Sequence, residues 1–147
     1  MNAERMTEAH LDGVAALEGE IFSEPWSRDA LRLLLTEDAI GFVCTEGGTV
    51  AAYGGMLLTP FEGQVTNIAV HPSFRRRGLG GAILRAMKKE ATARGLEQIS
   101  LEVRASNEPA IALYLGYGFY EAGLRRRFYK NPSEDAKIML LPLTEEE

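Results

Sequence analysis

One segment carries most of the information in this sequence: Asn67-Ile68-Ala69-Val70-His71-Pro72-Ser73-Phe74-Arg75-Arg76-Arg77-Gly78-Leu79-Gly80-Gly81. Its first residues favour a strand, and an arginine-rich, glycine-rich turn then leads into a helix. The three glycines let the backbone come close to a ligand. The first turn of the helix adds unpaired N–H groups and the positive end of its dipole. The segment therefore predicts a pyrophosphate-binding site.

Two common phosphate-binding motifs do not fit this segment. No Lys-Ser or Lys-Thr pair follows the glycines, as a nucleotide-binding P-loop requires, and the glycine spacing differs from that of the dinucleotide fingerprint. Coenzyme A is the better candidate ligand. The alternative is a tight turn without a ligand.

The residues up to and into this segment predict two helices and four strands. A short strand near residues 3–6 leads to Thr7, a good N-cap, and then to an apolar stripe at helical spacing formed by Leu11, Val14, Leu17, Ile21 and Phe22. Ser27 can cap a second helix, whose buried side chains are Leu31, Leu34 and Leu35. Strand formers then fill residues 40–45, 49–60 and 64–70, and the short turns between them predict an antiparallel meander.

The residues after the glycines predict a second half that alternates helices and strands. A helix over about residues 78–94 precedes a strand over 98–104. Asn107 and Pro109 open another helix, because Asn caps well and Pro is tolerated in the first turn, and Gly118 ends it. Two closing strands, near 119–127 and 136–141, complete a mixed sheet.

Arg75-Arg76-Arg77-Gly78-Leu79-Gly80 resembles the acetyl-CoA motif of the GNAT superfamily of N-acetyltransferases. The resemblance implies an α/β (α+β) fold with a mostly antiparallel sheet of about six to seven strands and about four helices. It also implies that acetyl-CoA, the acetyl donor, is bound through the loop and the strand before it, with Asn107 as a further contact. The coenzyme-binding residues on this reading are Ile68, Ala69, Val70, Arg75, Arg76, Arg77, Gly78, Leu79, Gly80, Gly81 and Asn107.

Further segments are similar to the bacterial ribosomal-protein N-terminal alanine acetyltransferases. They are Leu101 to Asn107, Ala110 to Tyr114, Gly118-Phe119, Pro25-Trp26-Ser27 and Glu134-Asp135-Ala136. This resemblance implies a protein N-terminus as acceptor, in particular that of a basic, alanine-starting ribosomal protein. It makes Glu102 the general base and Tyr114 the general acid. Phe128 stands where many relatives have a tyrosine, and Gly116 replaces a more usual polar residue, so the acceptor specificity is open.

The chemistry of these two side chains suits the reaction. An N-terminal amine has a pKa near 8, so roughly a tenth is neutral at pH 7, and a carboxylate is a sufficient base for it. Alternation along the strand places Glu102 on the face opposite Leu101 and Val103. The N–H of Val70 is the natural donor to the oxyanion, and the Tyr114 phenol can protonate the departing thiolate.

Each of these residues also has a purely structural interpretation. Glu102 fits a solvated strand position, Tyr114 could pack in the core beside Phe119, and Asn107 could be only a helix cap. Trp26 is compatible with core packing as well as with the acceptor groove. In the related enzymes a hairpin closes that groove, and here this region contains Arg125, Arg126, Arg127 and Tyr129.

The composition limits the remaining functions. A chain of 147 residues with 46% hydrophobic content forms one core and one domain, with residues 143–147 as an acidic tail. The charged opening and the lack of a long apolar run predict a cytoplasmic protein without membrane contact. One cysteine, Cys44, and two histidines, His10 and His71, predict no metal site and no disulfide.

The charges are divided unevenly along the chain. Residues 1–74 carry 3 basic and 11 acidic side chains, and residues 75–147 carry 13 basic and 10 acidic ones. This division suits an anionic ligand in the second half and a cationic partner at the first, although chance on a solvated surface also explains it. The net charge of -5 disfavours nucleic acid as a partner. Two further functions stay open, acetylation of a small-molecule amine and coenzyme A binding without turnover.

Overall fold

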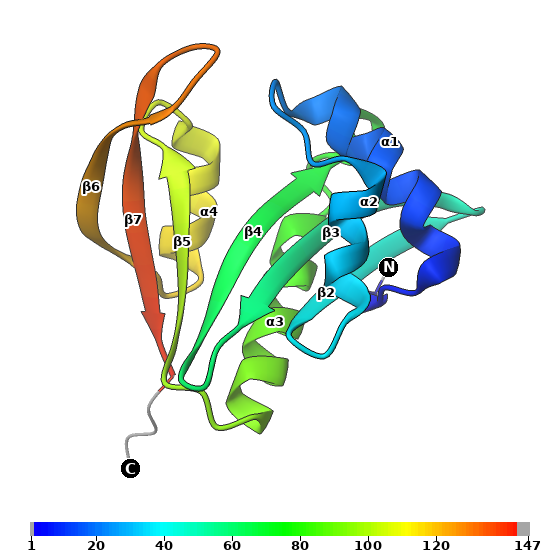
Figure 1. Ribbon diagram of the computed structural model, residues 1–147, viewed down its shortest axis with the longest axis horizontal. Coiled ribbons are helices and arrows are strands. Elements are labelled where there is room, and N and C mark those ends of the chain that lie inside the picture. The colour runs from blue at the N-terminus through cyan, green and yellow to red at the C-terminus, as the bar shows by residue number, and fades with distance from the viewer. Residues whose placement is uncertain (1, 144–147) are drawn as a thin grey trace.

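In the computed structural model, which describes residues 2–143, seven strands form one sheet in the order β1-β2-β3-β4-β5-β7-β6 (Figure 1). Only β4 and β5 run parallel, and all other neighbours are antiparallel. The strands are β1 (Glu4–Arg5), β2 (Ala39–Glu46), β3 (Thr49–Leu58), β4 (Glu62–Val70), β5 (Gln98–Arg104), β6 (Tyr120–Tyr129) and β7 (Glu134–Pro142). Together with four α-helices this confirms the predicted fold class.

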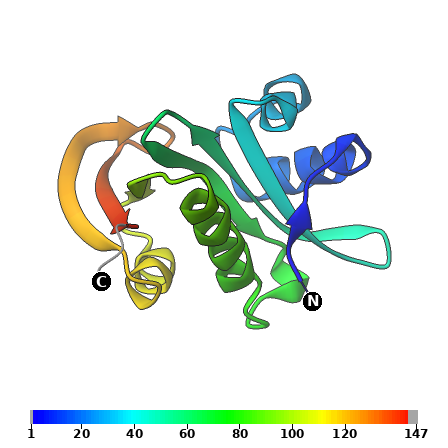
Figure 2. The same cartoon turned by 90° about the horizontal axis from the view of Figure 1, so that it is seen from below.

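The helices cover both faces of the sheet, as the view from below shows (Figure 2). α1 (Leu11–Ile21) and α2 (Arg28–Leu31) pack on one face, whereas α3 (Leu79–Ala93) and α4 (Glu108–Gly116) pack on the other. Short 3-10 turns form at Glu8–His10, Arg32–Leu35 and Pro72–Phe74. The predicted second helix is therefore only one α-turn followed by a 3-10 turn.

Local signals fix the ends of these helices. The Ser27 hydroxyl accepts from the Ala30 N–H at 3.0 Å, and the Asn107 side chain accepts from the Ala110 N–H at 3.2 Å. Gly78 caps α3 with φ of 76°, a left-handed conformation that a side chain would disfavour. The Ser27 and Asn107 caps are the ones that the sequence predicts, whereas Gly78, expected as the first helical residue, caps α3 instead.

The sheet divides between β4 and β5. These strands pair only at Glu62 with Gln98, Gly63 with Ile99 and Gln64 with Ser100, and they separate beyond that point (Figure 1). A β-bulge occurs where they part, because Asn67 lies opposite Gly55 and Val65 opposite Met56, which leaves Thr66 as the extra residue. Bulges bend a strand and increase its twist. The bulge thus accompanies the opening of the sheet.

The carboxyl end of the described chain is packed against the core. Leu143 is 8% exposed, and its N–H donates to the Glu97 carbonyl at 2.8 Å. The expected tail therefore does not include Leu143, because an apolar side chain at that point is buried. Residues 144–147 of the expected tail lie outside the described residues. No helix within residues 2–143 is long and apolar enough to cross a membrane.

Candidate active site

A cleft of about 710 Å³ lies where β4 and β5 separate. Four predicted site residues line it: Ile68 on β4, Glu102 on β5, and Asn107 and Tyr114 at the start and on the body of α4. The cleft is also lined by the α1–α2 loop and by the hairpin between β6 and β7. Their contributions are Phe22, Ser23, Glu24, Trp26, Phe128, Tyr129, Asn131 and Pro132.

The edge of β4 presents to this opening backbone groups that do not pair with β3. The His71 N–H donates to the Ala51 carbonyl of β3 at 2.8 Å, and Ala69 lies opposite Tyr53. Backbone groups alternate between the two edges of a strand, so those of Ile68 and Val70 point away from β3. The backbone of Ala69 pairs with β3, and its buried side chain packs on the α1 face. Ile68 and Val70 therefore provide the exposed edge.

The start of α3 offers backbone N–H groups that can bind an anion. The first bond of the helix runs from the Ala82 N–H to the Gly78 carbonyl at 3.0 Å, which leaves the N–H groups of Leu79, Gly80 and Gly81 without helical partners. A Cβ added to Gly80 would lie 3.0 Å from Leu113, and one added to Gly81 would lie 2.0 Å from the Tyr117 hydroxyl. The missing side chains thus also allow α4 to pack closely against α3.

The three arginines before α3 differ in their surroundings. The Nε of Arg75 donates to the Val70 carbonyl at 3.2 Å, and Arg76 has φ of 66°. Arg77 pairs with Glu46 at 3.1 Å and lies over the Phe74 ring. All three side chains are exposed. Exposed ion pairs contribute little stability, so Arg77 can exchange Glu46 for another anion.

Glu102 faces the cleft, and its neighbours Leu101 and Val103 are buried on the other face, as alternation predicts. Its Oε2 accepts from the Nε of Arg125 at 3.0 Å, and its side chain is 32% exposed. Among the described residues no hydrogen bond to its Oε1 forms. That oxygen is free to accept from a water or an amine.

Tyr114 is 7% exposed and packs against the Phe119 ring at 5.6 Å, so it lines the cleft and also belongs to the core. Burial, and secondarily Tyr129, raise the pKa of Tyr114 to about 12. Burial also raises the pKa of Tyr129 to about 12, with Glu102 as a second cause. Both phenols therefore carry their protons at neutral pH.

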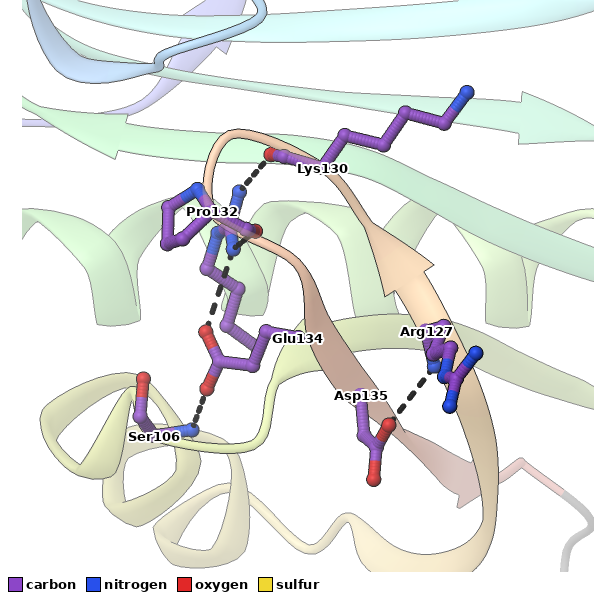
Figure 3. Close-up of polar contacts among 7 residues, drawn as sticks. Ser106, Arg127, Lys130, Pro132, Glu134 and Asp135 are labelled. Atoms are coloured by element: carbon purple, nitrogen blue, oxygen red, sulfur yellow. Dashed lines mark hydrogen bonds and ion pairs between the residues drawn. The ribbon is translucent and has the colours of Figure 1, made fainter.

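Hydrogen bonds join the hairpin between β6 and β7 to the end of β5 and the turn after it (Figure 3). Arg104 donates to the carbonyls of Lys130 and Pro132, each at 3.0 Å, and to Glu134 at 3.3 Å. Glu134 also accepts from the Ser106 N–H at 2.6 Å, and Asp135 accepts from the Arg127 N–H at 2.8 Å. These bonds hold the hairpin over the cleft.

The hydrogen bond from Ser106, with a further contribution from Arg104, lowers the pKa of Glu134 below its ordinary value. The Glu134 carboxylate is thus ionised throughout the neutral range. The hydrogen bonds of Glu134 and Asp135 explain why two adjacent acidic residues suit the fold at this point.

Sequence reasoning missed three of these features. The pair between Arg125 and Glu102 joins strands that are not neighbours, and the ties of Arg104 to the hairpin depend on the strand register. The third is Glu18, a fully buried carboxylate in α1. The sequence could have predicted this burial, because Glu18 falls four residues after Val14 and seven after Leu11, on the apolar stripe of the helix.

Residues 11–119 match the acetyltransferase (GNAT) family. The chain is 39% identical over 130 residues to the ribosomal protein bS18-alanine N-acetyltransferase of Escherichia coli strain K12, an alignment that covers 87% of this chain and 88% of the relative. It is 36% identical over 141 residues to the N-alpha-acetyltransferase RimI of Mycobacterium tuberculosis, with coverages of 91% and 87%.

The crystal structure of the Escherichia coli ribosomal-protein-S18-alanine N-acetyltransferase superposes with a TM-score of 0.90. The superposition covers 99% of this chain and 96% of that one at 35% identity. Since the matched region and the similarity span most of the chain, this protein belongs to the GNAT family of acetyltransferases.

Proposed function

We propose that this protein transfers the acetyl group of acetyl-CoA to the N-terminal α-amine of a protein, with Glu102 as general base and Tyr114 as general acid. One observation carries the proposal: a single cleft brings these two side chains together where β4 and β5 part. The names of the relatives support an alanine-starting ribosomal protein, bS18, as the acceptor. That acceptor would place the reaction in the cytoplasm.

The donor substrate fits the groups that the chain offers. The N–H groups at the start of α3 suit the pyrophosphate of acetyl-CoA, because they are unpaired and lie at the positive end of the helix dipole. Arg75, Arg76 and Arg77 add positive charge close by. The free edge formed by Ile68 and Val70 can pair with the amides of an extended pantetheine arm.

In this proposal Glu102 accepts the proton of the acceptor amine. An α-amine with a pKa near 8 is partly neutral at pH 7, so a carboxylate acting through one water suffices. The amine nitrogen then bonds to the carbonyl carbon of the acetyl group. The N–H of Val70, which points into the gap, is our candidate donor to the oxygen that becomes negative.

In this proposal Tyr114 protonates the leaving group. As the C–S bond breaks, the phenol donates its proton to the thiolate of coenzyme A and recovers one from solvent. Burial supports this role, because a pKa of about 12 keeps the phenol protonated at neutral pH. Tyr129, which shares the cleft with Glu102, is a candidate contact for the acceptor.

The proposal is tested by coenzyme A release from acetyl-CoA in the presence of matched acceptors. One basic peptide begins with a free alanine, a second has the same sequence with a blocked terminus and free lysines, and a panel of small amines completes the set. We expect release only with the free terminus. Turnover with small amines alone would instead identify a small-molecule acetyltransferase, and binding of acetyl-CoA without turnover would identify a binding module.

A further inference from the structure

Glu18 is the only charged side chain that is fully buried among the described residues. It lies in the last turns of α1, and the mechanism proposed above does not use it. A carboxylate out of contact with water is unfavourable unless hydrogen bonds replace its hydration. Its surroundings should therefore explain why it is there.

Three donors from three different parts of the chain converge on this carboxylate. Oε2 accepts from the backbone N–H of Trp26 and from the Asn67 side chain, each at 2.9 Å. Oε1 accepts from the hydroxyl of Tyr53 in β3. Burial, and secondarily the charge of Glu18, raise the pKa of Tyr53 far above its ordinary value, so its hydroxyl stays a donor.

Two of the three donors belong to residues that line the cleft. Trp26 comes from the α1–α2 loop, which forms the wall of the cleft opposite the β6–β7 hairpin. Asn67 lies beside the bulge in β4, next to the free edge at Ile68. Glu18 therefore links the α1–α2 loop, one wall of the cleft, to β4 through hydrogen bonds to a carboxylate that is buried beneath the cleft surface.

We infer that Glu18 is a positioning residue that holds the α1–α2 loop against β4 in the geometry that binds the acceptor. The inference rests on the proposed function for the identity of the acceptor only. A buried carboxylate is a poor source of stability, since an apolar side chain of similar size often serves the fold equally well. It is, however, a specific anchor, because only an acceptor group can hold the Trp26 N–H and the Asn67 amide together.

The test compares Glu18→Leu with Glu18→Gln. Leu keeps the volume and removes the acceptor. Gln keeps one oxygen for Trp26 and Asn67, while its new NH₂ group can donate to the Tyr53 hydroxyl. Val14→Ala, at a buried position one turn earlier in α1, is the control for a general loss of packing. All variants are assayed with the alanine-starting peptide and acetyl-CoA.

We expect Glu18→Leu to raise the KM for the peptide about tenfold, while Glu18→Gln stays within about threefold of the unmodified protein. The Kd for acetyl-CoA should stay within about twofold in every variant, because the hydrogen bonds of Glu18 among the described residues involve Trp26, Tyr53 and Asn67 and not the start of α3. Unchanged peptide KM in Glu18→Leu, or an equal rise in Val14→Ala, would overturn the inference.

Trp26 provides a second readout that does not depend on the acceptor. It is the only tryptophan of the chain, so its emission and its quenching by acrylamide report on the loop directly. Glu18→Leu should make Trp26 more accessible to the quencher, and Glu18→Gln should not.

If the unmodified protein fails to acetylate any peptide, the proposed function fails, and Trp26 quenching alone decides on the anchor. If Glu18→Leu does not fold, Asn67→Leu replaces it, because this variant removes the β4 group that Glu18 holds against the loop. Greater quenching of Trp26 in that variant than in Val14→Ala supports the anchor, and equal quenching overturns it.

Discussion

Arg125 in β6 donates from its Nε to Oε2 of Glu102 in β5 at 3.0 Å, although β7 lies between the two strands. The register of the three strands explains how Arg125 reaches Glu102 across β7. Ala136 of β7 lies opposite both Arg104 and Arg125, and cross-strand partners share a face. A small side chain at that point leaves room for Arg125 to extend across the strand. The base of the proposed reaction is therefore oriented by a residue of the β6–β7 hairpin.

Removing this partner should impair catalysis without affecting the fold. In Arg125→Gln we expect kcat to fall between about threefold and tenfold, because Glu102 loses its orientation but keeps its carboxylate. The pair is half-exposed, so the free energy of unfolding should change by less than about 1 kcal/mol. Steady-state kinetics and urea unfolding measure the two quantities. A loss of kcat as large as that of Glu102→Gln would contradict a supporting role.

The raised pKa of Tyr114 predicts a specific dependence of stability on pH. The folded protein keeps this proton up to about pH 12, whereas an unfolded tyrosine releases it near pH 10. The contribution is therefore complete below about pH 10 and is lost as the pH rises towards 12, by about 3 kcal/mol in total. Tyr114→Phe should lose less stability over this window in urea unfolding experiments. The control is Tyr120→Phe at an exposed position, and a slope in Tyr114→Phe equal to that of the unmodified protein would refute the prediction.

Glu134 predicts the opposite dependence at acidic pH. Its folded pKa lies below the ordinary value, so the stabilisation that it provides is present above about pH 4.5 and is lost as the pH falls through the folded pKa. Glu134→Gln lacks this titration and should lose less free energy of unfolding between about pH 6 and pH 3. Circular dichroism during acid titration measures the difference, with the exposed Glu37→Gln as control. Identical acid transitions in Glu134→Gln and the unmodified protein would count against the anchored hairpin.

Gly54 and Gly19 should respond to alanine in opposite directions. A Cβ on Gly54 in β3 would lie 2.5 Å from the Ile83 side chain and 2.8 Å from that of Met87, so these side chains of α3 would have to shift. We expect Gly54→Ala to lower the free energy of unfolding by about 1–3 kcal/mol and to weaken acetyl-CoA binding, since the start of α3 carries the glycine loop. Gly19 is exposed in α1 with nothing nearby, and Gly19→Ala should add about 0.5–1 kcal/mol. Chemical denaturation and calorimetric titration check both, and equal effects would contradict the packing described.

The sequence predicts the elements because these depend on local signals, whereas the roles proposed for Glu102 and Tyr114 come from the resemblance to related enzymes. Asn107 and Ser27 cap their helices, Gly78 precedes α3 as its cap, and alternation places Glu102 on the face opposite Leu101. The opening of the sheet could not be predicted, since it depends on a bulge at Thr66 and on the limited pairing of β4 with β5. Contacts such as Arg125 with Glu102 require the register of three strands. Of these long-range features, only the buried position of Glu18 could be predicted from residue spacing, because a charged residue on the apolar stripe of a helix faces the core.

The most direct test of the central claim is the position of the acetyl group on a basic, alanine-starting peptide after incubation with acetyl-CoA, determined by tandem mass spectrometry for the unmodified protein and for Glu102→Gln. We predict acetylation of the α-amine alone by the unmodified protein. In Glu102→Gln we predict a rate lower by about 10²-fold or more, with acetyl-CoA binding retained. Acetyl groups on lysine side chains, or α-amine acetylation by Glu102→Gln at the unmodified rate, would contradict it.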